Sequence, residues 1–326
     1  MPATPEALRA ALGALIVTID ESGADVGAVE APSYPDGPRP SSVITLRGAG
    51  VVGRGEHVGW TEAAHVACRD RTLPCVPRGR WELAAWSASL ATVVDGPYER
   101  AALEAAAIDL ALRQHGLTLF RLAGQAPRPV RYVVSFGQVA DPAAEASKQG
   151  DVELKVDADP AWSDATFDAL AGAGRIAVLD WKNGGARIDH ERAHRVLPDA
   201  LIEDPCWDAA PWSNGVTRRL AADAPLTGAE EVHRLPVRPA AANIKPARMG
   251  GVLEALAGVA ACQKLGIAVY LGGMFEVDIG RRQLQALAAL LCPDAPNDVA
   301  PIGRAGERPD RPARIRVDPD TAGFGA

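Results

Sequence analysis

Short apolar runs that alternate with helical patterns are the feature that most constrains the fold of this chain. The runs after residue 129 cover 130–136, 152–156, 176–179, 200–202, 225–227, 241–244 and 268–271. Stretches of about 10–20 residues with helical patterning separate them, which predicts β-α-β units and a parallel sheet. The even spacing, and the lack of a Gly-x-Gly-x-x-Gly turn after the first run, favour a closed barrel over an open dinucleotide-binding sheet.

The pattern before residue 129 is different. Strand-like alternation over 42–46 precedes a predicted helix over 98–114, in which Leu103, Ala107 and Leu110 recur on one face. We therefore predict an α+β domain over 1–127 and the (β/α) barrel over 128–296. The remaining segment, 297–326, is rich in Pro, Arg and Asp, and we expect it to pack back on the N-terminal domain.

Composition and charge exclude several classes of protein. Among 326 residues, 48% are hydrophobic and 23% are charged, which is typical of a globular protein. The net charge of -7 argues against a nucleic-acid partner, because phosphate binding needs a basic face. No apolar run reaches membrane-spanning length and no signal-peptide pattern opens the chain, so we expect no membrane partner. The five scattered cysteines lack metal-ligand spacing and predict reduced thiols in a cytoplasmic protein.

Charged residues follow four of the apolar runs in a regular order. Lys155, Asp180, Glu203 and Lys245 each stand at the end of a predicted strand. A lysine at a strand end is usually a solvated cap, and Glu-Asp-Pro often marks only a turn. Together, however, they predict chemistry at the mouth of a parallel barrel, where the carboxyl ends of the strands meet.

Several motifs give the chain a resemblance to a known family. They are Gly53-Arg54-Gly55-Glu56, the helix over 105–112, Lys245-Pro246-Ala247-Arg248-Met249-Gly250-Gly251, the run from Gly272-Gly273-Met274 to Gly280-Arg281, and Ala322-Gly323-Phe324-Gly325. In this order they resemble the enolase superfamily, in the branch of muconate-lactonizing enzyme, o-succinylbenzoate synthase and N-acylamino-acid racemase. The resemblance covers nearly the whole chain. It implies a TIM-type barrel with an α+β capping domain built from the N-terminal region and the C-terminal tail.

The resemblance also implies a reaction. Members of this family hold a substrate carboxylate on Mg²⁺, and a lysine removes the proton α to that carboxylate. Lys155 would then be the base, Lys245 the group on the opposite face, and Asp180 and Glu203 metal ligands. Substrate contacts are expected from Glu153, Tyr34, Gly273 and Met274, and Glu276 is expected to anchor the loop after the seventh strand. The six histidines are expected to be structural or surface residues, and His57, which follows the Gly-x-Gly-Glu turn, is also a candidate to approach the mouth.

The sequence departs from the family pattern at three positions. Members of the family carry a Lys-x-Lys motif on the second barrel strand, and in this chain Glu153 replaces its first lysine. The fifth strand of the family carries the motif Pro-x-x-x-Asp-Glu, whose aspartate is the third metal ligand. Aligned on Pro225, this motif places Ala229 at the ligand position, and Glu230 could replace it only after a register shift.

The third departure is Lys182, which leaves two arrangements open. In the first, the Lys182 ammonium lies between Asp180 and Glu203 in place of the metal, because a missing anion and an added cation oppose a divalent ion. In the second, Lys182 points to solvent, and two carboxylates with water molecules hold Mg²⁺.

Two functions follow from these observations. The first is an enzyme acting on a small carboxylate, by dehydration as in o-succinylbenzoate synthase or by racemisation, with lost or altered Mg²⁺ dependence. The alternative is a family member without the ancestral chemistry that serves as a binding or accessory protein. The retained Lys155 and Lys245 favour the enzyme. The resemblance is compatible with a homo-oligomer.

Overall fold

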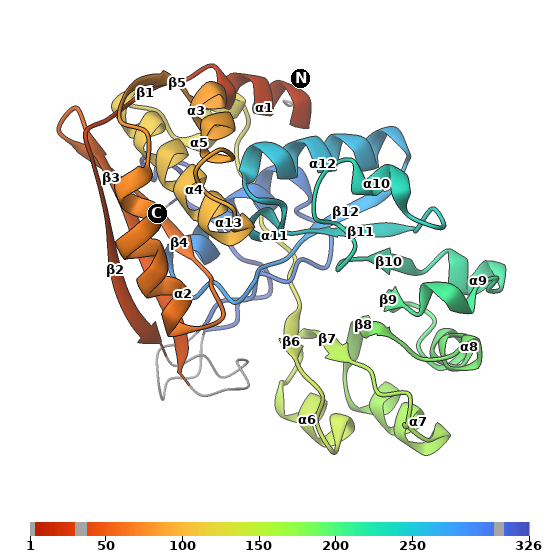
Figure 1. Cartoon of the computed structure of the whole chain (residues 1–326). Helices are drawn as coiled ribbons and strands as arrows, with labels where there is room; N and C mark the ends of the chain where they lie inside the picture. The colour runs from red at the N-terminus through yellow and green to blue at the C-terminus, as the bar shows by residue number, and fades with distance from the viewer. Residues whose placement is uncertain (1–3, 30–37, 303–309, 326) are drawn as a thin grey trace.

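The computed structural model describes residues 4–29, 38–302 and 310–325 (Figure 1). Seven parallel strands form one curved sheet, and their spatial order is their order in the sequence. The strands are β6 (Val134–Phe136), β7 (Glu153–Asp157), β8 (Arg175–Gly184), β9 (Leu201–Pro205), β10 (Leu220–Ala222), β11 (Ala241–Ile244) and β12 (Ala268–Leu271). Parallel pairing in sequence order requires a crossover between successive strands, as the alternating pattern predicted.

A short segment joins the two edges of this sheet. Asn297 forms a parallel bridge with Tyr132, which precedes β6, and Asp298 forms one with Gly272, which follows β12. The sheet therefore closes on itself, and neither β6 nor β12 is left as a bare edge. This confirms the predicted TIM-type barrel.

Helices alternate with the strands and cover the outside of the barrel. They are α6 (Pro142–Lys148), α7 (Asp164–Ala173), α8 (Arg187–Val196), α9 (Asn214–Thr217), α10 (Glu231–Arg234), α11 (Pro246–Met249), α12 (Val252–Lys264) and α13 (Ile279–Leu291), with a 3₁₀ turn at Trp207–Ala209. Apolar side chains between helices and strands, such as Leu154, Phe167 and Leu256, are almost completely buried. Among the described helices, none combines the length and the apolar character that crossing a membrane requires.

The capping domain consists of two antiparallel sheets and several helices. One sheet contains β2 (Glu21–Val29), β3 (Arg39–Gly48) and β4 (Val51–His57), and the other contains β1 (Ile16–Ile19) and β5 (Gly79–Glu82). The helices are α1 (Pro5–Gly13), α2 (Glu62–Ala67), α3 (Leu83–Leu90), α4 (Pro97–Gln114) and α5 (Leu119–Ala123), with short π and 3₁₀ turns at Cys68–Thr72 and Leu73–Cys75. The helix predicted over 98–114 is confirmed as α4, which is buried along most of its length.

The two glycines of the Gly-x-Gly-Glu motif let strand β4 lie directly on helix α4. A Cβ atom at Gly53 would stand 2.2 Å from the carbonyl oxygen of Ala106, and one at Gly55 would stand 2.1 Å from that of Ala102. No side chain can adopt these positions without moving the helix. The motif therefore determines how closely the sheet and the helix pack.

The C-terminal segment returns to both domains. Ile315 pairs with Val130 just before the barrel, and Gly323 forms a bridge with Thr118. The backbone N–H of Phe324 donates to the Asp109 carboxylate on α4 at 2.8 Å, and the Phe324 side chain is fully buried.

One predicted strand is wrong. Residues 225–227 form a turn, and the fifth barrel strand is β10, at Leu220–Ala222. The three residues of β10 are completely buried, whereas Pro225 has no N–H to donate to a neighbouring strand. Leu226 donates instead to the carbonyl of Asp223 within the turn. This correction changes the residue that the fifth strand delivers to the barrel mouth.

Replacing Gly53 by Ala is expected to destabilise the protein by about 1–3 kcal/mol or more, because the new methyl group collides with the α4 backbone. Gly27→Ala is the matched control, since Gly27 lies on exposed β2 and a Cβ there meets no atom within 4 Å. Urea unfolding midpoints measure both changes. Equal midpoints for the two variants would contradict the close packing of β4 on α4.

Candidate active site

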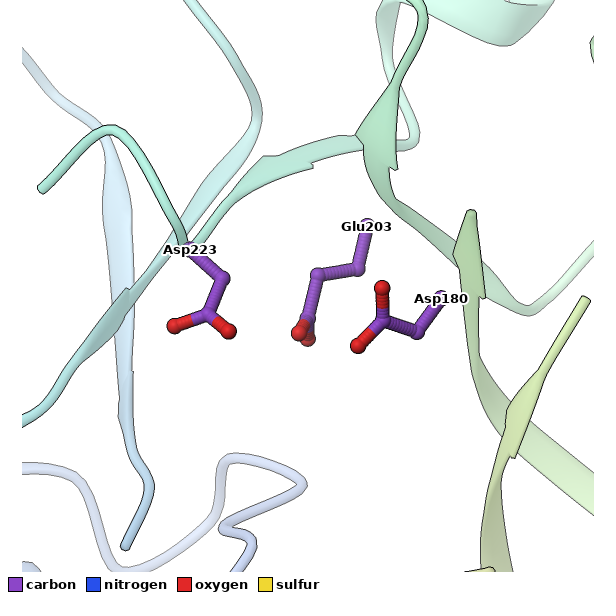
Figure 2. Close-up of side chains that lie close together, drawn as sticks. All are labelled: Asp180, Glu203 and Asp223. Carbon is purple, nitrogen blue, oxygen red and sulfur yellow. The ribbon is translucent and has the colours of Figure 1, made fainter. Parts of the chain in front are cut away.

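Three carboxylates converge at the carboxyl ends of neighbouring strands. Asp180 lies in β8 where its regular pairing with β9 ends, Glu203 lies in β9, and Asp223 follows β10 directly. One carboxylate oxygen from each lies within 4.8 Å of the others, and all three residues are buried. Figure 2 shows the carboxylates pointing toward one another, with Glu203 between the two aspartates. The register of the strands produces this arrangement. Glu203 pairs with Asp180 on one side and with Ala221 on the other. Asp223 lies two residues after Ala221 and therefore points to the same face.

The third carboxylate is Asp223, and the expectation of Ala229 or Glu230 at this position is corrected. Ala229 lies beyond the turn that follows β10, where its N–H donates to Glu254 on α12 at 2.8 Å. Glu230 immediately precedes α10. A signal for Asp223 was present in the sequence, because Asp223 follows the apolar run 220–222 just as Asp180 follows 176–179. The fifth strand was predicted at 225–227 and lies at 220–222, and this error led the prediction to Ala229 instead of Asp223.

Lys155 and Lys245 both reach the cluster, from opposite sides of the three acidic strands. Lys155 on β7 is 2% exposed; its ammonium is 3.0 Å from Asp180 and also donates to Glu203. Lys245, at the end of β11, donates to Asp223 at 2.8 Å. Arg248, in the same K-P-x-x-x-G-G motif, contacts Asp223 at 2.6 Å and was missed in the sequence.

Lys182 does not lie between Asp180 and Glu203, so the metal-replacement arrangement is not the one observed. Its ammonium is 2.5 Å from Asp180 and 3.2 Å from Asp157, and its side chain is 53% exposed. Lys155 is the cation that Asp180 and Glu203 share. The backbone explains the difference, because Lys182 and Asn183 adopt left-handed φ angles of 49° and 63°. The simple alternation of faces along a strand therefore stops at Trp181.

The remaining predicted site residues lie in different places. Glu153, at the start of β7, pairs with Arg131 at 2.5 Å and with Arg175 at 3.2 Å, at the opposite end of the strand from Asp157. Glu153 therefore lies away from the barrel mouth. Residues 153 and 155 point to the same face of β7, but residue 153 lies further from the mouth along the strand. Gly273 and Met274 lie in the wall of the cavity over the cluster. Tyr34 lies outside the described residues.

This cavity has a volume of about 800 Å³, a size that suits a small molecule. The barrel supplies charged groups to its wall, and both domains supply apolar groups. The charged groups are Lys155, Asp157, Lys182, Asp204, Asp223, Lys245, Arg248, Arg281 and Asp298, and the large apolar groups are Trp60, Phe136, Met274 and Phe275. Trp60 follows β4 in the capping domain and packs edge-on against Phe275 with ring centroids 5.7 Å apart.

The capping domain holds the loop that carries Met274 and Phe275. Glu56, the acid of the Gly-x-Gly-Glu motif, accepts N–H groups from Val277 at 2.7 Å and Gly280 at 2.9 Å. Glu276 accepts the N–H of Met274 at 2.7 Å, as expected for an anchor of this loop. The motif therefore sets both the packing of β4 and one wall of the cavity.

Burial and charge together set the pKa values of the cluster. Burial alone would raise the pKa of Asp180, but the ammonium groups of Lys155 and Lys182 reverse this and lower it. Burial would likewise raise the pKa of Asp223, and Lys245, Lys155 and Arg248 lower it. Glu203 is enclosed and adjoins two other carboxylates, so its pKa is raised well above the usual value. Burial also opposes the charge of Lys155, yet Glu203 and Asp180 raise its pKa.

The cluster fits a divalent cation. Its donors are three converging carboxylates, the hard oxygen ligands that Mg²⁺ prefers. Buried anions require compensating positive charge, and Lys155 supplies it between Asp180 and Glu203 in this structure. Asp204 supports the arrangement, because its carboxylate accepts the N–H groups of Asp223 and Ala224, both at 2.8 Å.

The comparisons with known proteins agree with this geometry. The N-terminal and C-terminal domains of the family described as domain of unknown function DUF8230 match residues 10–122 and 126–304. The chain belongs to the DUF8230 family. Over 239 residues it is 28% identical to N-succinylamino acid racemase of Thermus thermophilus, which covers 67% of this chain and 64% of that protein. A shorter match, 38% identical over 76 residues, covers 23% of this chain and 20% of o-succinylbenzoate synthase of Bacillus subtilis.

A solved structure resembles the whole fold. The dipeptide epimerase of Methylococcus capsulatus in complex with Mg²⁺ is 25% identical with a TM-score of 0.73, covering 86% of this chain and 89% of that one. These matches confirm the resemblance to the enolase superfamily that the sequence motifs predicted.

Asp223→Asn is expected to weaken Mg²⁺ binding at least about tenfold, because it removes the charge of one of the three carboxylates that could hold the ion. Glu230→Gln is the control from the position that the sequence first favoured, and it should bind Mg²⁺ as the unmodified protein does. Isothermal titration calorimetry measures both affinities. A loss in Glu230→Gln without a loss in Asp223→Asn would contradict the assignment of the third ligand.

His57 is expected to make stability depend on pH. It is buried against His65 rather than exposed at the cavity, and burial, with the charges of His65 and Arg39, lowers its pKa to about 3. The unfolded chain therefore binds the proton first, so stability falls as pH drops below about 6.5, by at most about 1.4 kcal/mol per pH unit. His57→Phe should reduce this slope between pH 6 and 4 in urea unfolding, and His233→Phe, on exposed α10, should not.

Proposed function

We propose that this protein is a Mg²⁺-dependent enzyme that removes and returns the proton α to a carboxylate, with an N-acylated amino acid as substrate. One observation carries the proposal: three buried carboxylates lie between two lysines that approach from strands on either side. Racemisation needs a proton-transfer group on each face of the α-carbon, and Lys155 and Lys245 are arranged in that way. The racemase and epimerase relatives support this reaction class.

Asp180, Glu203 and Asp223 would hold the ion. Bound there, Mg²⁺ would withdraw electron density from a substrate carboxylate and so acidify the α-proton. The Lys155 ammonium is within ion-pair distance of Asp180 and Glu203, and the Lys245 ammonium is within ion-pair distance of Asp223. Positive charge added beside Lys155 disfavours its ammonium form, which moves this lysine toward the neutral state that a base requires.

The cavity wall supports a substrate with both polar and apolar parts. Arg281 offers a guanidinium group in the wall for a second carboxylate or an acyl oxygen. Trp60, Phe136 and Phe275 form the apolar part of the wall, where an amino-acid side chain would lie.

Dehydration is a second candidate, supported by the match to o-succinylbenzoate synthase. It shares the first step, removal of an α-proton, and differs in the fate of the electron pair, which expels a hydroxyl group from the neighbouring carbon. The alternative, a binding protein without this chemistry, was based on the departures at Glu153, Ala229 and Lys182. Asp223 supplies the carboxylate that Ala229 lacks, which answers one of these three points.

Lys155→Ala and Lys245→Ala are each expected to lower kcat/KM for racemisation of N-succinyl amino acids at least about 100-fold. Proton NMR in D₂O with Mg²⁺ would follow exchange of the α-proton in each enantiomer separately. If the two lysines act on opposite faces, each variant should keep more exchange with one enantiomer, and the two should differ in which one.

Lys264→Ala is the control, because Lys264 is exposed on α12 and pairs with Glu6. A greater loss in Lys182→Ala than in Lys155→Ala would assign the proton transfer to the half-exposed lysine instead. If the Mg²⁺-loaded protein exchanges no α-proton in N-acylamino acids, dipeptides or o-succinylbenzoate precursors, the proposed function is wrong.

A further inference from the structure

Tyr270 connects two sides of the barrel through its interior. It lies on β12 and is 1% exposed, and its hydroxyl donates to Oε2 of Glu203 on β9. Strands β10 and β11 separate β12 from β9 in the sheet, so this contact passes across the inside of the barrel and not along a strand pair. The contact brings a neutral donor to Glu203, which lies between the two aspartates in Figure 2.

The two oxygens of Glu203 have different partners. Oε1 accepts from the Lys155 ammonium, which also contacts Asp180, so Oε1 is the oxygen that faces Asp180. Oε2 accepts from Tyr270. A cation entering the cluster competes with the Lys155 ammonium for Oε1, whereas a neutral hydroxyl on Oε2 does not repel it.

Each of the other carboxylates also has a partner that fixes its orientation. Asp180 accepts the backbone N–H of Lys182 at 3.0 Å, and Asp223 accepts from Arg248 at 2.6 Å. Glu203 has one more rotatable bond than an aspartate and therefore more conformational freedom to lose when it binds an ion. The hydrogen bond from Tyr270 restrains Oε2, the oxygen of Glu203 that does not contact Lys155.

We propose that Tyr270 is a positioning residue for the metal site, whose hydroxyl holds Glu203 with Oε1 directed at the ion. The identity of the ion as Mg²⁺ rests on the proposed function. Hydrogen-bond partners behind a metal ligand commonly contribute about 10- to 100-fold to metal affinity.

The test compares Tyr270→Phe with Tyr132→Phe. Both variants lose only a hydroxyl from a buried tyrosine, since Tyr132 is 5% exposed and donates to the carbonyl of Pro312 at 2.8 Å. Tyr132 shares a separate cavity with Glu153, away from the acidic cluster. Calorimetric titration with Mg²⁺ should show about 10- to 100-fold weaker binding in Tyr270→Phe and unchanged binding in Tyr132→Phe, with similar losses of thermal stability in metal-free protein.

A second measurement needs no variant with an altered site. The sequence contains 4 tyrosines, so spectra of protein labelled with ¹³C at the tyrosine ζ position are simple to assign. The Tyr270 resonance should move on Mg²⁺ titration and the Tyr132 resonance should not. An unmoved Tyr270 resonance at saturation, or equal Mg²⁺ affinities in Tyr270→Phe and the unmodified protein, overturns the inference.

These outcomes separate the inference from the proposed function. Mg²⁺ binding that depends on Tyr270, without any α-proton exchange, would overturn the proposed function alone. Exchange activity with Mg²⁺ affinity independent of Tyr270 would overturn the inference alone. Failure of the unmodified protein to bind Mg²⁺ would overturn both.

Discussion

The concentration of buried negative charge at the barrel mouth is the constraint on which the rest of the structure depends. Asp180, Glu203 and Asp223 are removed from water, and buried anions persist only when cations and hydrogen-bond donors surround them. Lys155, Lys245, Arg248 and Lys182 supply the positive charge, and Tyr270 supplies a neutral donor. These groups compensate the buried negative charge of the three carboxylates.

The capping domain positions part of the wall of the cavity at the barrel mouth. Glu56 binds the backbone of the loop after β12, and Arg39 donates to the carbonyls of Gly59 and Val58 beside Trp60. This loop holds Phe275 at a left-handed φ of 68°, a conformation that a bulky residue adopts only when its surroundings compensate for the strain. The apolar wall of the cavity therefore depends on the docking of the two domains.

The barrel and most of the site could be predicted because both follow from local patterns. Runs 241–244 and 268–271 became strands with those bounds. Lys155, Asp180, Glu203 and Lys245 reach one cluster because the first three lie in strands of the parallel sheet and Lys245 directly follows another. Asp223 was missed for a local reason as well. The pattern at 225–227 resembles a strand end, and only the pairing of Ala221 with Glu203 and Ala241 shows which residues belong to the sheet.

By itself, the sequence determined the order of the strands, the closed barrel and the chemical types at its mouth, since apolar periodicity and strand-end charges are written in consecutive residues. Only the tertiary structure decided which charges pair. With its left-handed backbone, Lys182 lies beside Asp180 and Asp157 and not between Asp180 and Glu203, and depth along β7 separated Glu153 from Lys155. Tyr270 meets Glu203 from a strand 67 residues further along the chain. Such contacts depend on curvature, depth and local backbone geometry, which a residue and its sequence neighbours do not specify.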